Sequence, residues 1–84
     1  MARRAIFSDE ARADIRGIDR ETALRLLKTL DRFLETDAGN VKLLQGFDPP
    51  RYRLRIGDWR FIFRKHYDDA IEVLRVRNRK EAYR

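Results

Sequence analysis

The chain of 84 residues is long enough for one small domain and too short for a second hydrophobic core, so we expect residues 1–84 to form a single domain. It has no cysteine, which excludes disulfides, a zinc ribbon and a thiol nucleophile. No apolar run exceeds three residues, so the sequence predicts neither a membrane span nor a secretory signal, and we expect a cytoplasmic protein.

The position of the positive charge is more informative than its size. The formal net charge is +6. Residues 1–50 carry nine Lys and Arg against nine Asp and Glu, whereas residues 51–84 carry eleven against five. The whole excess therefore lies in the C-terminal part of the chain, which predicts that this part binds a polyanion.

The first half of the chain predicts a strand followed by two helices. Residues 4–8 are a short strand candidate, and Ser8 or Asp9 can cap the helix that follows. Asp19 can cap a second helix that runs to about Thr36, because its leucines and phenylalanine recur at helical spacing. The two helices are expected to form a hairpin whose apolar stripes a sheet must cover.

The second half predicts strands. Gly39 and Asn40 are expected to end the second helix. A short extended piece follows at residues 41–44, and residues 51–56, 59–65 and 70–77 then read as three strands. Gly57 and Asp58 suit a two-residue hairpin loop, which allows only antiparallel neighbours. The sequence thus predicts an α+β fold in the order β-α-α-β-β-β, with a helical hairpin packed on one face of an antiparallel sheet.

Strand alternation separates an apolar face from a basic face in the last three strands. The apolar set, expected to pack on the helices, is Tyr52, Leu54, Ile56, Trp59, Phe61, Phe63, Leu74 and Val76. The opposite set, expected to bind RNA or phosphate, contains Arg51, Arg53, Arg55, Arg60, Arg64, Arg75 and Arg77, with Val73 beside them. Trp59 and the phenylalanines are expected in the core.

The simplest explanation of the basic set is an ordinary solvated sheet face. Such a face normally mixes charge signs across strands, whereas no acid alternates with Arg51, Arg53 and Arg55. Arginine also grips phosphate with two donors and stacks on bases, which favours a nucleic-acid or other anion site.

Two other residues are ambiguous. Tyr83 could stack on a base or exchange a proton, but composition alone favours a tail tyrosine packed on the core. His66 has no second ligand or acidic partner in view and is interpreted as an exposed structural residue. No metal-ligand spacing or Gly-rich phosphate loop is present, so no metal and no cofactor is expected.

Three motifs resemble the RelE/ParE superfamily of toxins from type II toxin–antitoxin systems. They are VKLLQGF at residues 41–47, YRLRIGDWRFIF at residues 52–63 and VLRVRNRKEAYR at residues 73–84. The resemblance implies a RelE-like microbial ribonuclease-type fold. In its RelE branch, the toxins cut messenger RNA in the ribosomal A site by attack of a 2′-hydroxyl on the adjacent phosphate, without a metal.

The resemblance also implies catalytic residues. Arg53 and Arg55 match two basic positions of the first meander strand, and Arg60 matches a phosphate-binding arginine. Arg79 and Tyr83 match the arginine and the tyrosine of the C-terminal motif. RelE itself has lysines on the first meander strand, and arginine cannot deprotonate at neutral pH, so Tyr83 is the best remaining candidate for a general base.

The implied function is therefore a ribosome-dependent endoribonuclease, or mRNA interferase, that inhibits translation. Two alternatives remain: a ParE-like DNA gyrase inhibitor that binds without catalysis, and a degenerate member that binds only its antitoxin. The expected partners are a cognate antitoxin, in a toxin–antitoxin hetero-oligomer, and messenger RNA on the ribosome.

Overall fold

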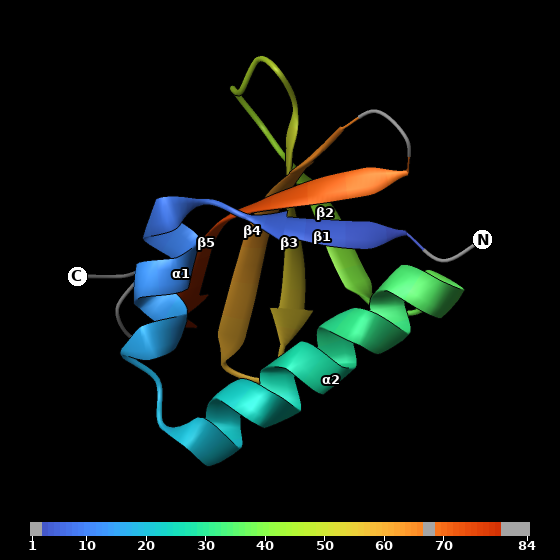
Figure 1. Ribbon diagram of the computed structural model, residues 1–84. Helices are drawn as coiled ribbons and strands as arrows, with labels where there is room; N and C mark the ends of the chain where they lie inside the picture. Colours follow the sequence, from blue (N-terminus) through green and yellow to red (C-terminus); the bar gives the residue numbers. More distant parts are fainter. Residues whose placement is uncertain (1–2, 67–68, 80–84) are drawn as a thin grey trace.

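The computed structural model describes residues 3–66 and 69–79, and its elements follow the predicted order β-α-α-β-β-β with one strand more, because the short extended piece after the second helix also pairs as a strand. They are β1 (Arg4–Phe7), α1 (Asp9–Arg16), α2 (Arg20–Thr36), β2 (Asn40–Leu44), β3 (Arg51–Ile56), β4 (Trp59–Lys65) and β5 (Ala70–Asn78). Two helices thus pack on one five-stranded sheet (Figure 1), and the predicted α+β class is confirmed.

The sheet is mixed, whereas the prediction was antiparallel throughout. Its strand order is β1-β5-β4-β3-β2, and β2 to β5 form an antiparallel meander. β1 pairs with β5 in parallel, with Arg4 opposite Ala70 and Phe7 opposite Val73. This direction lets the chain leave β1 beside the second half of β5, where α1 packs.

Both helices begin where side-chain caps predict. The Ser8 hydroxyl accepts a hydrogen bond from the Ala11 backbone N–H, and the Asp19 carboxylate accepts one from the Thr22 N–H. α2 ends at Thr36, as its apolar spacing predicted, but Gly39 and Asn40 do not cap it. Its C-cap is Asp37, at a φ of 59°, and a short polar side chain tolerates this left-handed conformation.

The two helices cover different parts of the sheet and do not lie side by side as a tight hairpin (Figure 1). α1 packs against β5. α2 supplies four buried side chains, Leu26, Leu30, Phe33 and Leu34, to a core that also contains Leu54, Phe61 and Phe63. The ring centroids of Phe33 and Phe63 are 5.9 Å apart, so α2 is held mainly by apolar packing on the middle strands.

Strand alternation predicted the faces of β3 and β4 correctly but not the first half of β5. The register shifts at Ile62/Phe63, where Phe63 pairs with Val73 and Ile62 pairs with Arg75. This irregularity leaves Leu74 out of the pairing, and a bulge of this kind inverts the alternation on one side of it. Val73 is 0% exposed and belongs to the core, so its predicted place among the arginines was wrong.

The aromatic residues depart in part from the prediction, because Trp59 and Phe7 are only partly buried against the core. Phe47, in the loop between β2 and β3, is 44% exposed, whereas Phe33, Phe61 and Phe63 are buried. No helix among residues 3–66 and 69–79 is long and apolar enough to cross a membrane.

Candidate nucleic-acid interface

Three arginines form a row across the face of the sheet that is turned away from α2. Arg55 on β3 pairs with Arg60 on β4, which pairs with Arg77 on β5. Directly opposed residues on neighbouring strands share a face, with Cβ atoms about 5 Å apart. We call Arg55, Arg60 and Arg77 the arginine ladder. Like charges at this spacing repel, so the ladder suits an anionic ligand.

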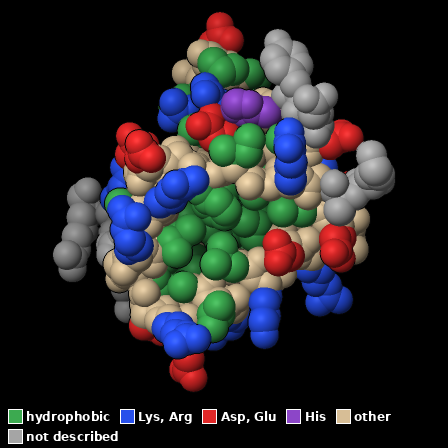
Figure 2. All heavy atoms as spheres, in the orientation of Figure 1, with side chains coloured by type: hydrophobic (Ala, Val, Ile, Leu, Met, Phe, Trp, Pro, Cys, Tyr) green, Lys and Arg blue, Asp and Glu red, His purple; other side chains and the backbone are tan. Residues whose placement is uncertain are grey.

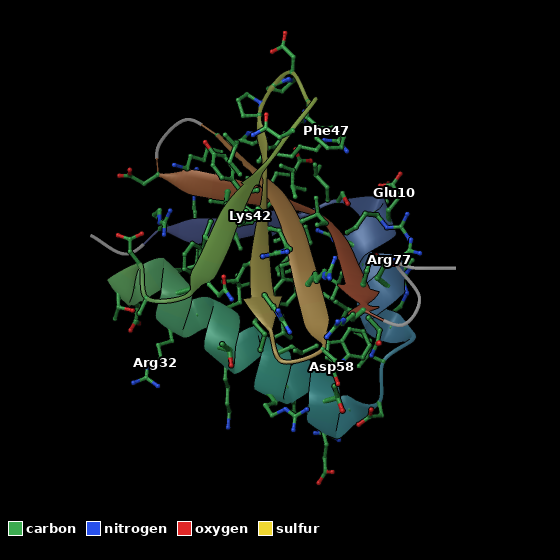
Figure 3. All side chains as sticks on the ribbon, turned by 180° about the vertical axis from the view of Figure 1, so that it is seen from behind. Glu10, Arg32, Lys42, Phe47, Asp58 and Arg77 are labelled. Atoms are coloured by element: carbon green, nitrogen blue, oxygen red, sulfur yellow. The ribbon has the colours of Figure 1, made fainter. Side chains whose placement is uncertain are left out.

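A second row of the same face adds a residue that the sequence analysis did not single out. Lys42 on β2 pairs with Arg53, which pairs with Ile62 on β4. Figure 3 looks onto this face, with Lys42 on β2 and Arg77 near the end of β5. The signal for Lys42 was present in the sequence, because its strand alternates Lys42 against Val41 and Leu43.

Arg75, in this second row, is neutralised by an acid from α1. Its Nε and Nη2 atoms donate to the two Asp14 carboxylate oxygens at 2.9 and 3.1 Å. The Val76 backbone N–H donates to the same carboxylate at 2.9 Å. Burial alone would raise the pKa of Asp14, but the hydrogen bonds from Arg75 and Val76 outweigh it and lower this pKa. Arg75 therefore has a structural partner.

Arg64 is paired as well. Its Nε donates to Glu72 at 2.7 Å, and His66 Nε2 lies 3.0 Å from the same carboxylate oxygen. The hydrogen bond with His66 is the largest cause that lowers the pKa of Glu72, and the hydrogen bond from Arg64 adds to it against the opposing effect of burial. The sequence analysis found no acidic partner for His66, because regular alternation along β5 would place Glu72 on the same face as Leu74 and Val76. The bulge instead places it on the face of Arg64, with which it pairs.

The other predicted arginines differ in their surroundings. The Arg51 guanidinium lies over the Phe47 ring, 4.6 Å from its centroid, and Arg55 Nε donates to the Gly57 carbonyl at 3.2 Å. Within the part of the chain that the structure describes, the Nε atoms of Arg53 and Arg77 are buried without a hydrogen-bond partner. Buried donors without partners are costly, so these two guanidinium groups are held in place at an energetic cost.

The C-terminal pair is only partly described. The Arg79 backbone N–H donates to the Asp58 carbonyl at 2.6 Å, which holds this residue beside the β3–β4 hairpin, and its side chain is exposed. Tyr83 lies outside the described residues, so its predicted place near the arginines stays a prediction. Among the described residues no three His, Cys, Asp or Glu side chains are grouped so that they could hold a metal.

The helix side of the sheet has a different chemistry. Hydrophobic side chains gather in a hollow between the two helices (Figure 2). Trp59 lines two cavities on the helix side of the sheet, one with Ala13, Asp14 and Ile18 and one with Leu26, Ile56 and the polar side chains of Arg25 and Asp58. The molecule thus has a basic face and, behind it, an apolar hollow.

A family model matches almost the whole chain. The model of the ParE toxin of type II toxin–antitoxin systems, parDE, matches residues 5–83. The chain belongs to this family. The resemblance to the RelE/ParE superfamily seen in the three sequence motifs is confirmed. No curated protein matches the chain at a significant level.

Solved structures confirm the fold of this toxin. A chain of the archaeal RelE–RelB complex from Pyrococcus horikoshii superposes with a TM-score of 0.73, at 22% identity over 94% of this chain and 97% of that one. A chain of the toxin–antitoxin complex RelBE2 from Mycobacterium tuberculosis gives 0.74, at 20% identity over 94% and 100%. A chain of the RelB–RelE complex from Methanococcus jannaschii gives 0.72, at 20% identity over 93% and 94%.

Proposed function

We propose that this toxin is an endoribonuclease that cuts messenger RNA on the ribosome and thereby inhibits translation. The observation that supports the proposal is the arginine ladder, with Lys42 and Arg53 in the next row. All five side chains are positively charged, so they concentrate positive charge on one face of the sheet. A phosphate backbone is the ligand that would relieve their repulsion.

The same side chains suit the chemistry of RNA cleavage. Attack of a 2′-hydroxyl on the adjacent phosphorus creates a pentavalent phosphorane with additional negative charge on its oxygens. Guanidinium groups already held in place by the sheet can stabilise that charge without reorganising, and this is usually the largest single contribution to catalysis. In the proposal, Arg55, Arg60 and Arg77 bind phosphate, and Arg79 and Tyr83 complete the site from the C-terminal segment.

Inhibition of DNA gyrase is the second candidate, and the match to the ParE family model favours it. A gyrase inhibitor would use the same basic face for binding, without cleaving RNA. The two functions predict different first events in the cell: loss of protein synthesis for the nuclease, and loss of DNA replication with double-strand breaks for the gyrase inhibitor.

The decisive experiment is pulse-labelling of protein and DNA after the toxin is expressed without an antitoxin. We expect translation to stop first and transcripts to be cut within codons. Arg60→Ala should lower the cleavage rate by about two orders of magnitude, since one preorganised charged donor is typically worth that much. The lower rate should relieve the arrest. Tyr83→Phe should also relieve it.

The matched control is Arg32→Ala, which removes the same charge from α2, where Arg32 points away from the sheet (Figure 3). It should remain fully toxic. If replication stops before translation, the protein is a gyrase inhibitor and not a nuclease. If Arg60→Ala and Tyr83→Phe both remain fully toxic, the assigned site is wrong. If the wild type causes no growth arrest, the protein is a member that binds only its antitoxin.

We also propose that a protein antitoxin covers the hollow around Trp59. The family is defined by toxin–antitoxin systems, and three similar solved structures are toxin–antitoxin complexes. An amphipathic helix of the antitoxin can bury its apolar side between α1 and α2, as helices do in other apolar grooves. The partner would then leave the basic face to be blocked by a separate acidic segment.

A further inference from the structure

An aromatic side chain lies exposed at the end of the basic face that is far from the β3–β4 hairpin. Phe47, in the loop between β2 and β3, is 44% exposed. Figure 3 shows it at the opposite end of the sheet from Asp58, with Lys42 between them. A single exposed apolar side chain is common on protein surfaces, so Phe47 is informative only through its neighbours.

One neighbour is Arg51, at the start of β3. Its guanidinium lies over the Phe47 ring, 4.6 Å from the centroid, and covers one face of that ring. Within the described part of the chain, no hydrogen bond or ion pair engages this guanidinium, so its donors are available to a ligand. An exposed aromatic ring beside an available cation is the combination with which proteins bind nucleotides of single strands.

Phe47 and Arg51 also lie in line with the arginine ladder. Alternation along β3 places Arg51, Arg53 and Arg55 on the same face. Successive members are two residues apart, about 7 Å, which is close to the separation of neighbouring phosphates in an extended single strand. Arg51 is about 13 Å from Arg55 on this scale. A strand with one phosphate at the ladder therefore reaches Arg51 two phosphates further on.

The surface beside the loop leaves room for a nucleotide. Pro49, of the same loop, lines an open cavity of about 370 Å³ together with Arg64, Lys65 and His66. Pockets for small ligands begin at roughly 300 Å³. The Glu72 carboxylate is bound to Arg64 and His66, at 2.7 and 3.0 Å, so it offers no unpaired negative charge to repel a phosphate.

We propose that Phe47 and Arg51 form a subsite for an outlying nucleotide of the RNA substrate. The Phe47 ring stacks on the base, and the Arg51 guanidinium binds the phosphate of that nucleotide. The inference rests on the nuclease function proposed above and keeps the reacting phosphate at the ladder, so no bond forms or breaks at the subsite. Stacking accepts any base, so the subsite fixes the position of the strand without selecting its sequence.

A double-mutant cycle between protein and RNA tests the stacking. A short fluorescent RNA with a 2′-deoxy nucleotide at the cut position binds without reacting, and anisotropy gives its Kd for the full-length toxin. Two matched RNAs lack the base two nucleotides to the 5′ side or to the 3′ side of the cut. We expect Phe47→Ala and one of these abasic RNAs each to weaken binding about 10-fold, as is typical of stacking on one base. Together they should weaken it no more than either change alone, because both remove the same contact.

Three variants serve as controls. Phe47→Tyr keeps an aromatic ring and should bind like the wild type. Leu24→Ala removes a similarly exposed apolar side chain, 49% exposed on α2, and should change nothing. Arg60→Ala should weaken the intact and the abasic RNAs by the same factor, because the ladder contacts a different phosphate. Circular dichroism of each variant establishes that it is folded.

Cleavage on ribosomes programmed with messenger RNA separates the subsite from the reaction centre. Phe47→Ala should raise KM about 10-fold and leave kcat unchanged, because the stacked base is held equally before and during the reaction. Arg60→Ala should instead lower kcat, because the charge that it stabilises develops during the reaction.

The two proposals fail in different ways. If the wild type cuts RNA while Phe47→Ala keeps its Kd and KM, or while its loss simply adds to that of the abasic RNAs, the inference is wrong and the nuclease function stands. The inference is also wrong if Phe47→Ala weakens only the complex with the antitoxin. If the wild type shows the expected coupling in binding but cuts no RNA, the nuclease function fails and the subsite remains as an RNA-binding site.

Discussion

Asp14 links the first helix to the last strand through a single carboxylate. It accepts hydrogen bonds from the Val76 backbone N–H and from the Arg75 guanidinium, and only 16% of its side chain is exposed. A partly buried carboxylate with two such donors stabilises the fold while it is ionised. At the same time it holds Arg75 at the α1 side of the sheet, so this arginine contributes less to ligand binding than its place in the second row suggests.

Asp14→Asn tests this role through the pH dependence of stability. The pKa of Asp14 is lowered from its ordinary value of 3.8, so its stabilisation is complete above that pH and is lost as the pH falls through the folded-state pKa. We expect the variant to be about 2 kcal/mol less stable at pH 7, the typical value of a hydrogen bond to a charged group. The difference should shrink below pH 4.

Urea denaturation of both proteins at pH 7 and at pH 3 measures the effect. Asp31→Asn, which changes an exposed carboxylate on α2, is the control and should match the wild type at both values. Equal midpoints of Asp14→Asn and the wild type at pH 7 would show that the contact does not stabilise the fold.

At the scale of elements, β1 and the start of α1 together cover the outer edge of β5. β1 pairs with Ala70–Val73, the first part of β5. Beyond Val73 the neighbours come from the start of α1: the Ser8 backbone N–H donates to the Val73 carbonyl, and the Ser8 hydroxyl donates to the Leu74 carbonyl at 2.9 Å. Unpaired strand edges invite other strands to pair, so this arrangement protects β5.

Ser8 is therefore expected to matter more than an ordinary helix cap. Ser8→Ala removes both the cap of α1 and the hydrogen bond to β5, and should destabilise the fold by about 2 kcal/mol. Asp19→Ala removes only the exposed cap of α2 and should cost clearly less. Thermal unfolding of the two variants beside the wild type gives the comparison, and an equal loss in both would mean that the contact with Leu74 contributes nothing.

On the scale of the whole molecule, two surfaces of opposite character lie back to back. The basic face collects the ladder, Lys42 and Arg53, and the helix side carries the apolar hollow around Trp59 (Figures 2 and 3). Binding to the first surface depends on charge and releases counterions, whereas binding to the second depends on apolar burial. The two partners can therefore be told apart by salt.

We predict a steep salt dependence for RNA and a shallow one for the antitoxin helix. If four cations contact phosphates, the logarithm of the RNA association constant should fall with log salt at a slope of roughly −3, and Arg55→Ala should reduce the slope by roughly 0.7. Fluorescence of Trp59, the only tryptophan of the chain, reports binding of the antitoxin helix. If the affinity for the antitoxin falls with salt as steeply as the affinity for RNA, the antitoxin helix binds the basic face and not the hollow.

Local chemistry explains why most elements could be predicted. The caps at Ser8 and Asp19 and the glycine at the β3–β4 hairpin, Gly57 with a φ of 60°, act within a few residues of themselves. Strand alternation is equally local, which is why the faces of β3 and β4 were right and why the ladder could be anticipated. The exposure of Phe47 could not be predicted, because it depends on where the β2–β3 loop projects.

By itself, the sequence determined the order of the elements, the apolar and basic faces of the middle strands and the location of the charge excess. Only the tertiary structure decided the parallel pairing of β1, the bulge that turns Glu72 toward Arg64 and His66, and the meeting of Asp14 with Arg75. The physical reason is the range of the interactions. Caps and alternation act between close neighbours in the chain, whereas a bulge and an ion pair between distant segments depend on how strands and helices pack in space.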